Sequence, residues 1–129
     1  MKWSDKYATG IDRIDGQHKT IFKMVEDFRD ALDHEEGEKV YAVFLKSLNQ
    51  YFRHHIGFEE RCMDECRCPI ANECKREHTR FVNVLSDYQQ RFETFGFDRG
   101  DARSLADKVD KWLSDHICRV DRELNRYQT

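Results

Sequence analysis

Two pairs of potential metal ligands stand four residues apart near the middle of the chain. His55 and Glu59 form the first pair, and Cys74 and His78 form the second. Residues with this spacing lie about 40° apart around an α-helix, so both members of a pair can point to one place. Two helices joined by a short turn would bring the pairs face to face, and facing side chains build metal sites in helix bundles. The spacing therefore predicts a metal-binding core.

Further candidate ligands extend this site to the rest of the chain. One histidine lies on the apolar face of each of four helical patterns: His18, His55, His78 and His116. A single histidine on such a face is more often a hydrogen-bonded core residue than a ligand. Four of them beside two carboxylates, Glu59 and Asp121, favour metal binding, and one zinc ion would use only three or four of these groups. The set is more typical of two metal ions that are bridged by the carboxylates.

Asp121 fits this arrangement less well than the other candidates. It follows His116 by five residues, which corresponds to about 140° around an ideal helix. It reaches the same site only if the metal cluster is wide or if the helix is locally overwound or bulged.

Hydrophobic residues recur at helical spacing in four segments, and no segment carries the signal of a strand. The expected helices run from Gln17 to about Leu32, from about Glu38 to Glu65, from about Ile70 to Phe95, and from Asp101 or Ser104 to about Tyr127. Arg67 to Pro69 should form the turn before the third helix, since proline suits the first position of a helix. Asp101 or Ser104 can cap the fourth.

The residues before the first helix have a different composition. Trp3, Tyr7, Ile11 and Ile14 lie among polar residues, with Gly10 as a breaker, which predicts an extended arm laid against the body. A chain of 129 residues is long enough for one domain with a substantial core. We therefore expect a single all-α domain, 1–129: an N-terminal extended arm (1–14) and an antiparallel up-down-up-down four-helix bundle (15–129).

Charge and hydropathy exclude several kinds of partner. The formal net charge is −3, and the 22 basic and 25 acidic residues are scattered, so the chain lacks the basic patch that binds nucleic acid. No apolar run approaches the roughly 20 residues of a membrane span, and the polar start is unlike a signal peptide. We expect a soluble cytoplasmic protein with reduced thiols and with neither nucleic acid nor membrane as partner.

Taken together, the motifs resemble the hemerythrin family, and its bacterial branch in particular. They are Gln17-His18, His55-x3-Glu59-Glu60-x2-Met63, Pro69-x4-Cys74-x3-His78-x2-Phe81 and Trp112-Leu113-x2-His116-Ile117-x3-Asp121. The resemblance extends from the arm to the last helix. Each fragment alone would be weak, but the combined spacing is specific.

The resemblance implies a non-heme di-iron centre that binds dioxygen at one of two Fe ions as a peroxide. By position, one iron would take His18 and His55, and the other would take His78, His116 and the residue at 74. Glu59 and Asp121 would bridge the irons, together with an oxo or hydroxo group from water. The residues that would line or back the ligand pocket are Met63, Phe81, Trp112, Leu113 and Ile117, which also suit simple core packing.

Cys74 departs from the family's pattern, which has histidine at this position. In one interpretation its thiolate binds iron, which would lower the reduction potential and favour reducing a bound ligand. In a second, Cys74 does not bind, and that iron keeps an open position for solvent, peroxide or nitric oxide. In a third, Cys74 belongs to a thiol switch that oxidation pulls away from the metal.

Five cysteines are many for a chain of this kind, and four of them fall within 13 residues: Cys62, Cys66, Cys68 and Cys74. Their order lacks the paired C-x-x-C of a structural zinc site, and an odd total argues against a disulfide scaffold. Cys62, Cys66 and Cys68 are therefore candidate redox thiols. The alternative is that they are buried packing residues, as we expect for Cys118.

Three functions from different classes follow. The first is a di-iron protein that binds dioxygen or a related small molecule for storage, delivery or sensing. The second is a thiolate-tuned di-iron enzyme that reduces peroxide, superoxide or nitric oxide with electrons from a donor protein. The third is a redox or iron sensor that uses its cysteine cluster.

Overall fold

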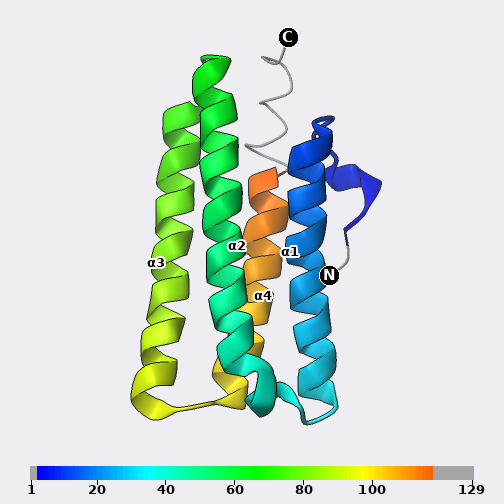
Figure 1. Ribbon diagram of the computed structural model, residues 1–129, viewed down its shortest axis with the longest axis vertical. Helices are drawn as coiled ribbons and strands as arrows, with labels where there is room; N and C mark the ends of the chain where they lie inside the picture. Colours follow the sequence, from blue (N-terminus) through cyan, green and yellow to red (C-terminus); the bar gives the residue numbers. More distant parts are fainter. Residues whose placement is uncertain (1–2, 118–129) are drawn as a thin grey trace.

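Four helices make up most of the part of the chain that the structure, a computed structural model, describes: residues 3–117. They are α1 (Asp12–Asp33), α2 (Gly37–Glu65), α3 (Ala71–Phe95) and α4 (Arg99–His116), and a short 3-10 helix, η1 (Asp5–Tyr7), precedes them. Short connections join the helices into an antiparallel up-down-up-down bundle (Figure 1). The expected all-α four-helix bundle is confirmed, and none of the described helices is long and apolar enough to cross a membrane.

The segment before the bundle differs from the expected extended arm. It contains the helical turn η1, in which Tyr7 is buried, and α1 begins at Asp12, five residues before the expected start at Gln17. The backbone N–H and the hydroxyl of Thr9 both donate to the carboxylate of Asp15 at 2.8 Å. These two bonds fasten the segment to the first turn of α1, where acidic side chains also stabilise a helix start.

Turn and cap residues were the least predictable part of the fold. Pro69 lies in the turn before α3 but is not its first residue. Asp98 caps α4, because its carboxylate accepts the backbone N–H of Asp101 at 2.8 Å. The expected cap, Asp101 or Ser104, is therefore wrong: the helix begins at Arg99, before the hydrophobic pattern becomes visible.

An aromatic core holds the helices together at one end of the bundle. Phe28 of α1 stacks on Phe44 of α2 with ring centroids 4.1 Å apart, and Tyr41 of α2 packs edge-on against Phe92 of α3 at 5.2 Å. Each of α1 and α3 packs beside both α2 and α4. Because neighbours are antiparallel, the first turns of α1 and α3 meet the last turns of α2 and α4 at the other end. That end carries the candidate ligands.

Candidate metal centre

A completely buried carboxylate lies at the centre of the candidate site. Glu59 projects from α2 into the core and has no exposed surface. Its Oε1 lies 3.0 Å from Nε2 of His78 and 3.4 Å from Nε2 of His116. Its Oε2 lies 3.4 Å from Nε2 of His55 and 3.7 Å from Nε2 of His18. Each oxygen thus faces its own pair of histidines, and an anion buried this deeply requires compensating positive charge.

His18 of α1 and His55 of α2 form one half of the site. Both are fully buried, their Nε2 atoms are 3.2 Å apart, and their rings meet edge to face with centroids 4.6 Å apart. Together with Glu59 they offer three ligand atoms that lie within 4.8 Å of one another. Two imidazoles and one carboxylate oxygen at this separation can hold a metal ion and leave coordination positions open for other ligands.

Cys74 and His78 of α3 form the other half together with His116 of α4. The Sγ of Cys74 lies 3.3 Å from Oε1 of Glu59, 3.5 Å from Nε2 of His78 and 3.6 Å from Nε2 of His116. Cys74 is fully buried, and the four ligand atoms again lie within 4.8 Å of one another. The thiol therefore lies close enough to the other candidate ligands to bind the same metal ion. Because Glu59 belongs to both halves, its carboxylate can bridge two ions.

The protonation states of His55 and Glu59 in the metal-free protein suit metal binding. Burial lowers the pKa of His55 to about 3, against the opposing charge of Glu59. Burial alone would raise the pKa of Glu59, but its interaction with His55 and hydrogen bonds from His116, His18 and His78 outweigh this effect and hold that pKa well below its ordinary value. The site thus combines a neutral imidazole with an ionised carboxylate, which are the forms in which these groups bind metals.

A further set of residues orients the ligand histidines through their second ring nitrogen. Three Nδ1 atoms are held in this way: His55 by Gln17 at 2.7 Å, His78 by Glu60 at 2.9 Å, and His116 by Glu77 at 2.8 Å. Each partner is the immediate sequence neighbour of a candidate ligand. Its side chain bonds a histidine of the following helix. Such bonds fix the orientation of a metal-binding ring and raise its basicity.

Sequence reasoning assigns no role to these three partners. Gln17 and Glu60 appear in the motifs only as neighbours of His18 and Glu59, and Glu77, which precedes His78, is not named in them. The usable signal was that adjacency: a residue next to an inward ligand lies about 100° around the helix and can face a neighbouring helix. Which neighbour it reaches depends on helix register, which the sequence does not show.

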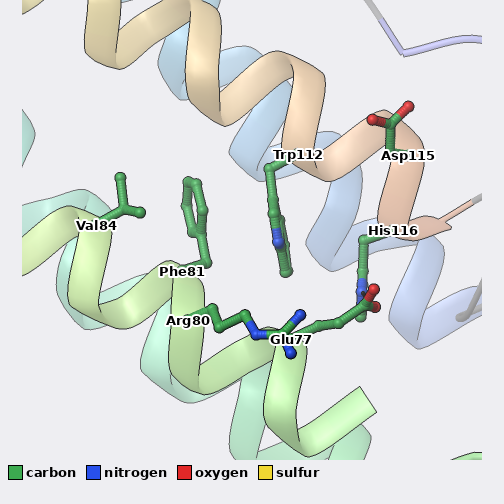
Figure 2. Close-up of a pocket in the computed structure, with 7 residues that line it drawn as sticks. All are labelled: Glu77, Arg80, Phe81, Val84, Trp112, Asp115 and His116. Atoms are coloured by element: carbon green, nitrogen blue, oxygen red, sulfur yellow. Dashed lines mark hydrogen bonds and ion pairs between the residues drawn. The ribbon is translucent and has the colours of Figure 1, made fainter. Parts of the chain in front are cut away.

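A surface hollow of about 230 Å³ lies between α3 and α4, against His116 (Figure 2). The indole of Trp112 is nearly parallel to the His116 ring, with centroids 4.5 Å apart, and to the Phe81 ring at 4.6 Å. Figure 2 shows the three rings in a row, with Arg80 and Glu77 below them. His116 therefore contributes to the wall of this hollow. Trp112 also lines the hollow, and its ring lies between those of His116 and Phe81.

The five residues expected to line or back the ligand pocket fall into two groups. Phe81, Leu113 and Ile117 belong to the main core, with Trp112 packed against it, whereas Met63 lies in a separate small cluster with Ile14, Cys68 and Cys74. Phe81 and Trp112 also line the hollow between α3 and α4. The role of all five in holding a small ligand stays a prediction.

The remaining cysteines of the described chain surround Cys74. Cys68 is buried in the same small cluster, and the half-buried Cys62 and Cys66 pack against it. No disulfide joins these four cysteines of the described chain, and burial, assisted by nearby acidic groups, raises the pKa of Cys62. A redox role for them stays a prediction.

Two further candidate residues, Asp121 and Cys118, lie outside residues 3–117. The position of Asp121 as a bridging ligand and that of Cys118 as a packing residue therefore both stay predictions.

Comparison with known proteins gives one family. The hemerythrin HHE cation binding domain matches residues 9–127, a range that includes every candidate ligand. A bacteriohemerythrin of Pseudomonas aeruginosa (strain LESB58) is 34% identical over 117 residues, which are 91% of this chain and 74% of that protein. A bacteriohemerythrin of Methylococcus capsulatus is 30% identical over 126 residues, 95% of this chain and 92% of the relative.

Solved structures agree with the sequence matches. A crystal structure of a leucine-to-tyrosine mutant of a hemerythrin superposes with a TM-score of 0.79 at 28% identity and covers 95% of this chain and 92% of its own. The arrangement of the helices around the candidate site is therefore shared with a solved hemerythrin.

Proposed function

Since the chain belongs to the hemerythrin family, we propose that it is a non-heme di-iron protein that binds dioxygen or a related small molecule for storage, delivery or sensing. The observation that carries this proposal is the position of Glu59, whose two buried oxygens face two separate sets of ligand atoms. A shared carboxylate between two ligand sets suits a bridged two-metal centre. Imidazole and carboxylate ligands together suit iron.

In this proposal each half of the site would hold one iron. Glu59 would be a ligand common to both, and the family resemblance adds Asp121 as a second shared carboxylate. Bound ferrous iron would supply the electrons that dioxygen accepts on binding. The chain itself supplies imidazoles, which Gln17, Glu60 and Glu77 hold in fixed orientations.

Buried apolar side chains lie beside the site. Leu113 of α4 and Ile117, which follows His116 directly, are 1% and 0% exposed, and Met63, which packs with Cys74, is 0% exposed. An apolar shell disfavours the escape of a charged product into water and limits side reactions of a bound small molecule. These side chains therefore support the retention of a ligand at the metal.

Cys74 is an iron ligand in this proposal, because its Sγ lies among the same ligand atoms as the histidine nitrogens. A metal ion deprotonates a thiol that coordinates it, and the added negative charge makes iron easier to oxidise. This favours a second candidate function for the same centre: reduction of peroxide, superoxide or nitric oxide, with electrons from a donor protein.

Anaerobic loading with ferrous iron, followed by oxygen, tests the leading function. We expect two irons per chain and a charge-transfer band that forms with oxygen and vanishes on deoxygenation. Glu59→Gln removes the bridging charge and should weaken iron binding by at least about 100-fold. Glu65→Gln, at the exposed end of α2, is the matched control and should keep both irons. Immediate oxidation of the wild type without the band would contradict reversible binding.

Replacing the thiol tests the second function. Cys74→His should lose reductive turnover and gain a longer-lived oxygenated complex, since imidazole donates less charge than thiolate. Cys68→Ser changes a neighbouring buried thiol and should leave turnover unchanged. The same turnover in Cys74→His and in the wild type would rule out a thiolate-tuned enzyme.

A further inference from the structure

The hydrogen-bond partners of the ligand histidines are chemically unequal in the two halves of the site. In the half that contains Cys74, both histidines bond carboxylates: His78 bonds Glu60 at 2.9 Å and His116 bonds Glu77 at 2.8 Å. In the other half, His55 bonds the amide oxygen of Gln17. Two carboxylates therefore bond the ligand histidines of the Cys74 half, whereas a neutral amide bonds His55 in the other half.

These carboxylates are well placed to act on a metal through the rings. Each accepts the Nδ1–H of an imidazole whose Nε2 faces Glu59. The side chain of Glu77 is 11% exposed and that of Glu60 is 26% exposed, so water screens them incompletely. An imidazole that donates to a carboxylate is a stronger electron donor to its metal than one that donates to an amide.

The other anionic candidate ligands do not cancel this difference. Glu59 is shared by both halves, and Asp121 would be shared too as a second bridge. The thiol of Cys74 lies in the half that already has the two carboxylates. Hydrogen bonds and ligand charge of this kind set the reduction potential of protein-bound iron.

We propose that Glu60 and Glu77 are positioning residues that make the Cys74 half the electron-rich half, so that its iron is oxidised first. In the iron-loaded protein, the first electron would therefore be lost from the iron that Cys74, His78 and His116 would hold. This inference rests on the proposed di-iron function and adds to it an order in which the two irons change charge.

Redox titration of the iron-loaded protein tests the inference. The potential is set anaerobically with mediators, and each oxidation step transfers one electron from one iron to the mediator. Glu60→Gln and Glu77→Gln keep a hydrogen-bond acceptor of the same shape but remove its charge. We expect each to raise the midpoint potential of the first step more than that of the second. Gln17→Glu, the matched reverse change in the other half, should lower the second midpoint more than the first.

Several results would overturn the inference. Unchanged midpoints in both glutamine variants, equal shifts of both steps, or a single two-electron step in the wild type would each contradict an unequal centre. A purely structural role of the two glutamates would change helicity or iron content without this selective shift, so circular dichroism and iron counting accompany each titration. A wild type that takes up fewer than two irons overturns the proposed function as well, whereas two irons with unshifted midpoints overturn this inference alone.

Discussion

Buried polar side chains have different consequences at the two ends of this bundle. Glu59 is completely buried, but histidines surround it and a cation can neutralise it. Tyr41 is 1% exposed in the aromatic core, and its hydroxyl finds no hydrogen-bond partner in the part of the chain that the structure describes. The first residue belongs to the candidate metal centre, whereas the unpaired hydroxyl of the second lowers the stability of the fold.

Tyr41→Phe should keep the packing and remove the unpaired hydroxyl. We expect the free energy of unfolding at neutral pH to stay equal or to rise by about 1 kcal/mol. Burial raises the pKa of Tyr41 to about 12, above the value of about 10 in the unfolded chain. The stability that this shift contributes is present below pH 10 and is lost as the pH rises towards 12. The variant should therefore lose less stability than the wild type across this window.

Urea unfolding at about pH 8 and about pH 11 measures this difference. Tyr51→Phe, on a half-buried ring of α2, serves as the control for removing a tyrosine. If wild type and Tyr41→Phe lost the same free energy between the two pH values, the buried hydroxyl would have no part in alkaline unfolding.

The candidate ligands were predictable at this scale, but their partners were not. The i,i+4 spacing of His55 with Glu59 and of Cys74 with His78 is a property of a single helix, so the sequence shows it. The bond from His116 to Glu77 joins two helices, and it depends on their relative height and rotation. Local spacing contains no information about either.

At the scale of elements, helix boundaries depend on single side-chain bonds. The helices themselves were predictable, because a stripe of apolar residues recurs at helical spacing through each of them. The start of α4 was not, since it rests on one contact between the Asp98 carboxylate and a backbone N–H. The start of α1 likewise depends on contacts from Thr9 to Asp15 that no periodicity reveals.

Asp98→Ala should destabilise the protein through α4. The change leaves the backbone N–H of Asp101 without its cap, which costs about 1 kcal/mol. Urea unfolding should show a lower midpoint with an unchanged slope. Asp98→Asn is the matched control, because asparagine caps as well as aspartate, and it should unfold like the wild type. Equal midpoints for the alanine and asparagine variants would show that the cap is unimportant.

At the scale of the whole molecule, the candidate centre connects all four helices. It takes His18 from α1, Glu59 from α2, His78 from α3 and His116 from α4. A metal bound to these side chains binds the folded state only, because no unfolded chain keeps ligands from four helices together. Metal binding is therefore coupled to the stability of the entire bundle.

Iron removal should lower the melting temperature. A ligand whose free concentration is about 1,000 times its dissociation constant stabilises the folded state by about 4 kcal/mol. In a chain of this size, that corresponds to a shift of the melting temperature on the order of 10 °C. Differential scanning calorimetry of the loaded protein with and without a chelator measures this shift. The chelator should lower the melting temperature of Glu59→Gln by a smaller amount, because this variant binds iron more weakly. An unchanged melting temperature of the wild type would mean that the metal does not link the helices.

X-ray absorption at the iron edge of the loaded wild type tests the central claim most directly. We predict an iron–iron separation of about 3.5 Å, as in bridged two-metal sites, and a sulfur neighbour at half occupancy per iron that is absent in Cys74→Ser. Nitrogen and oxygen neighbours alone, with no second iron in range, would contradict both the bridge at Glu59 and the thiolate at Cys74.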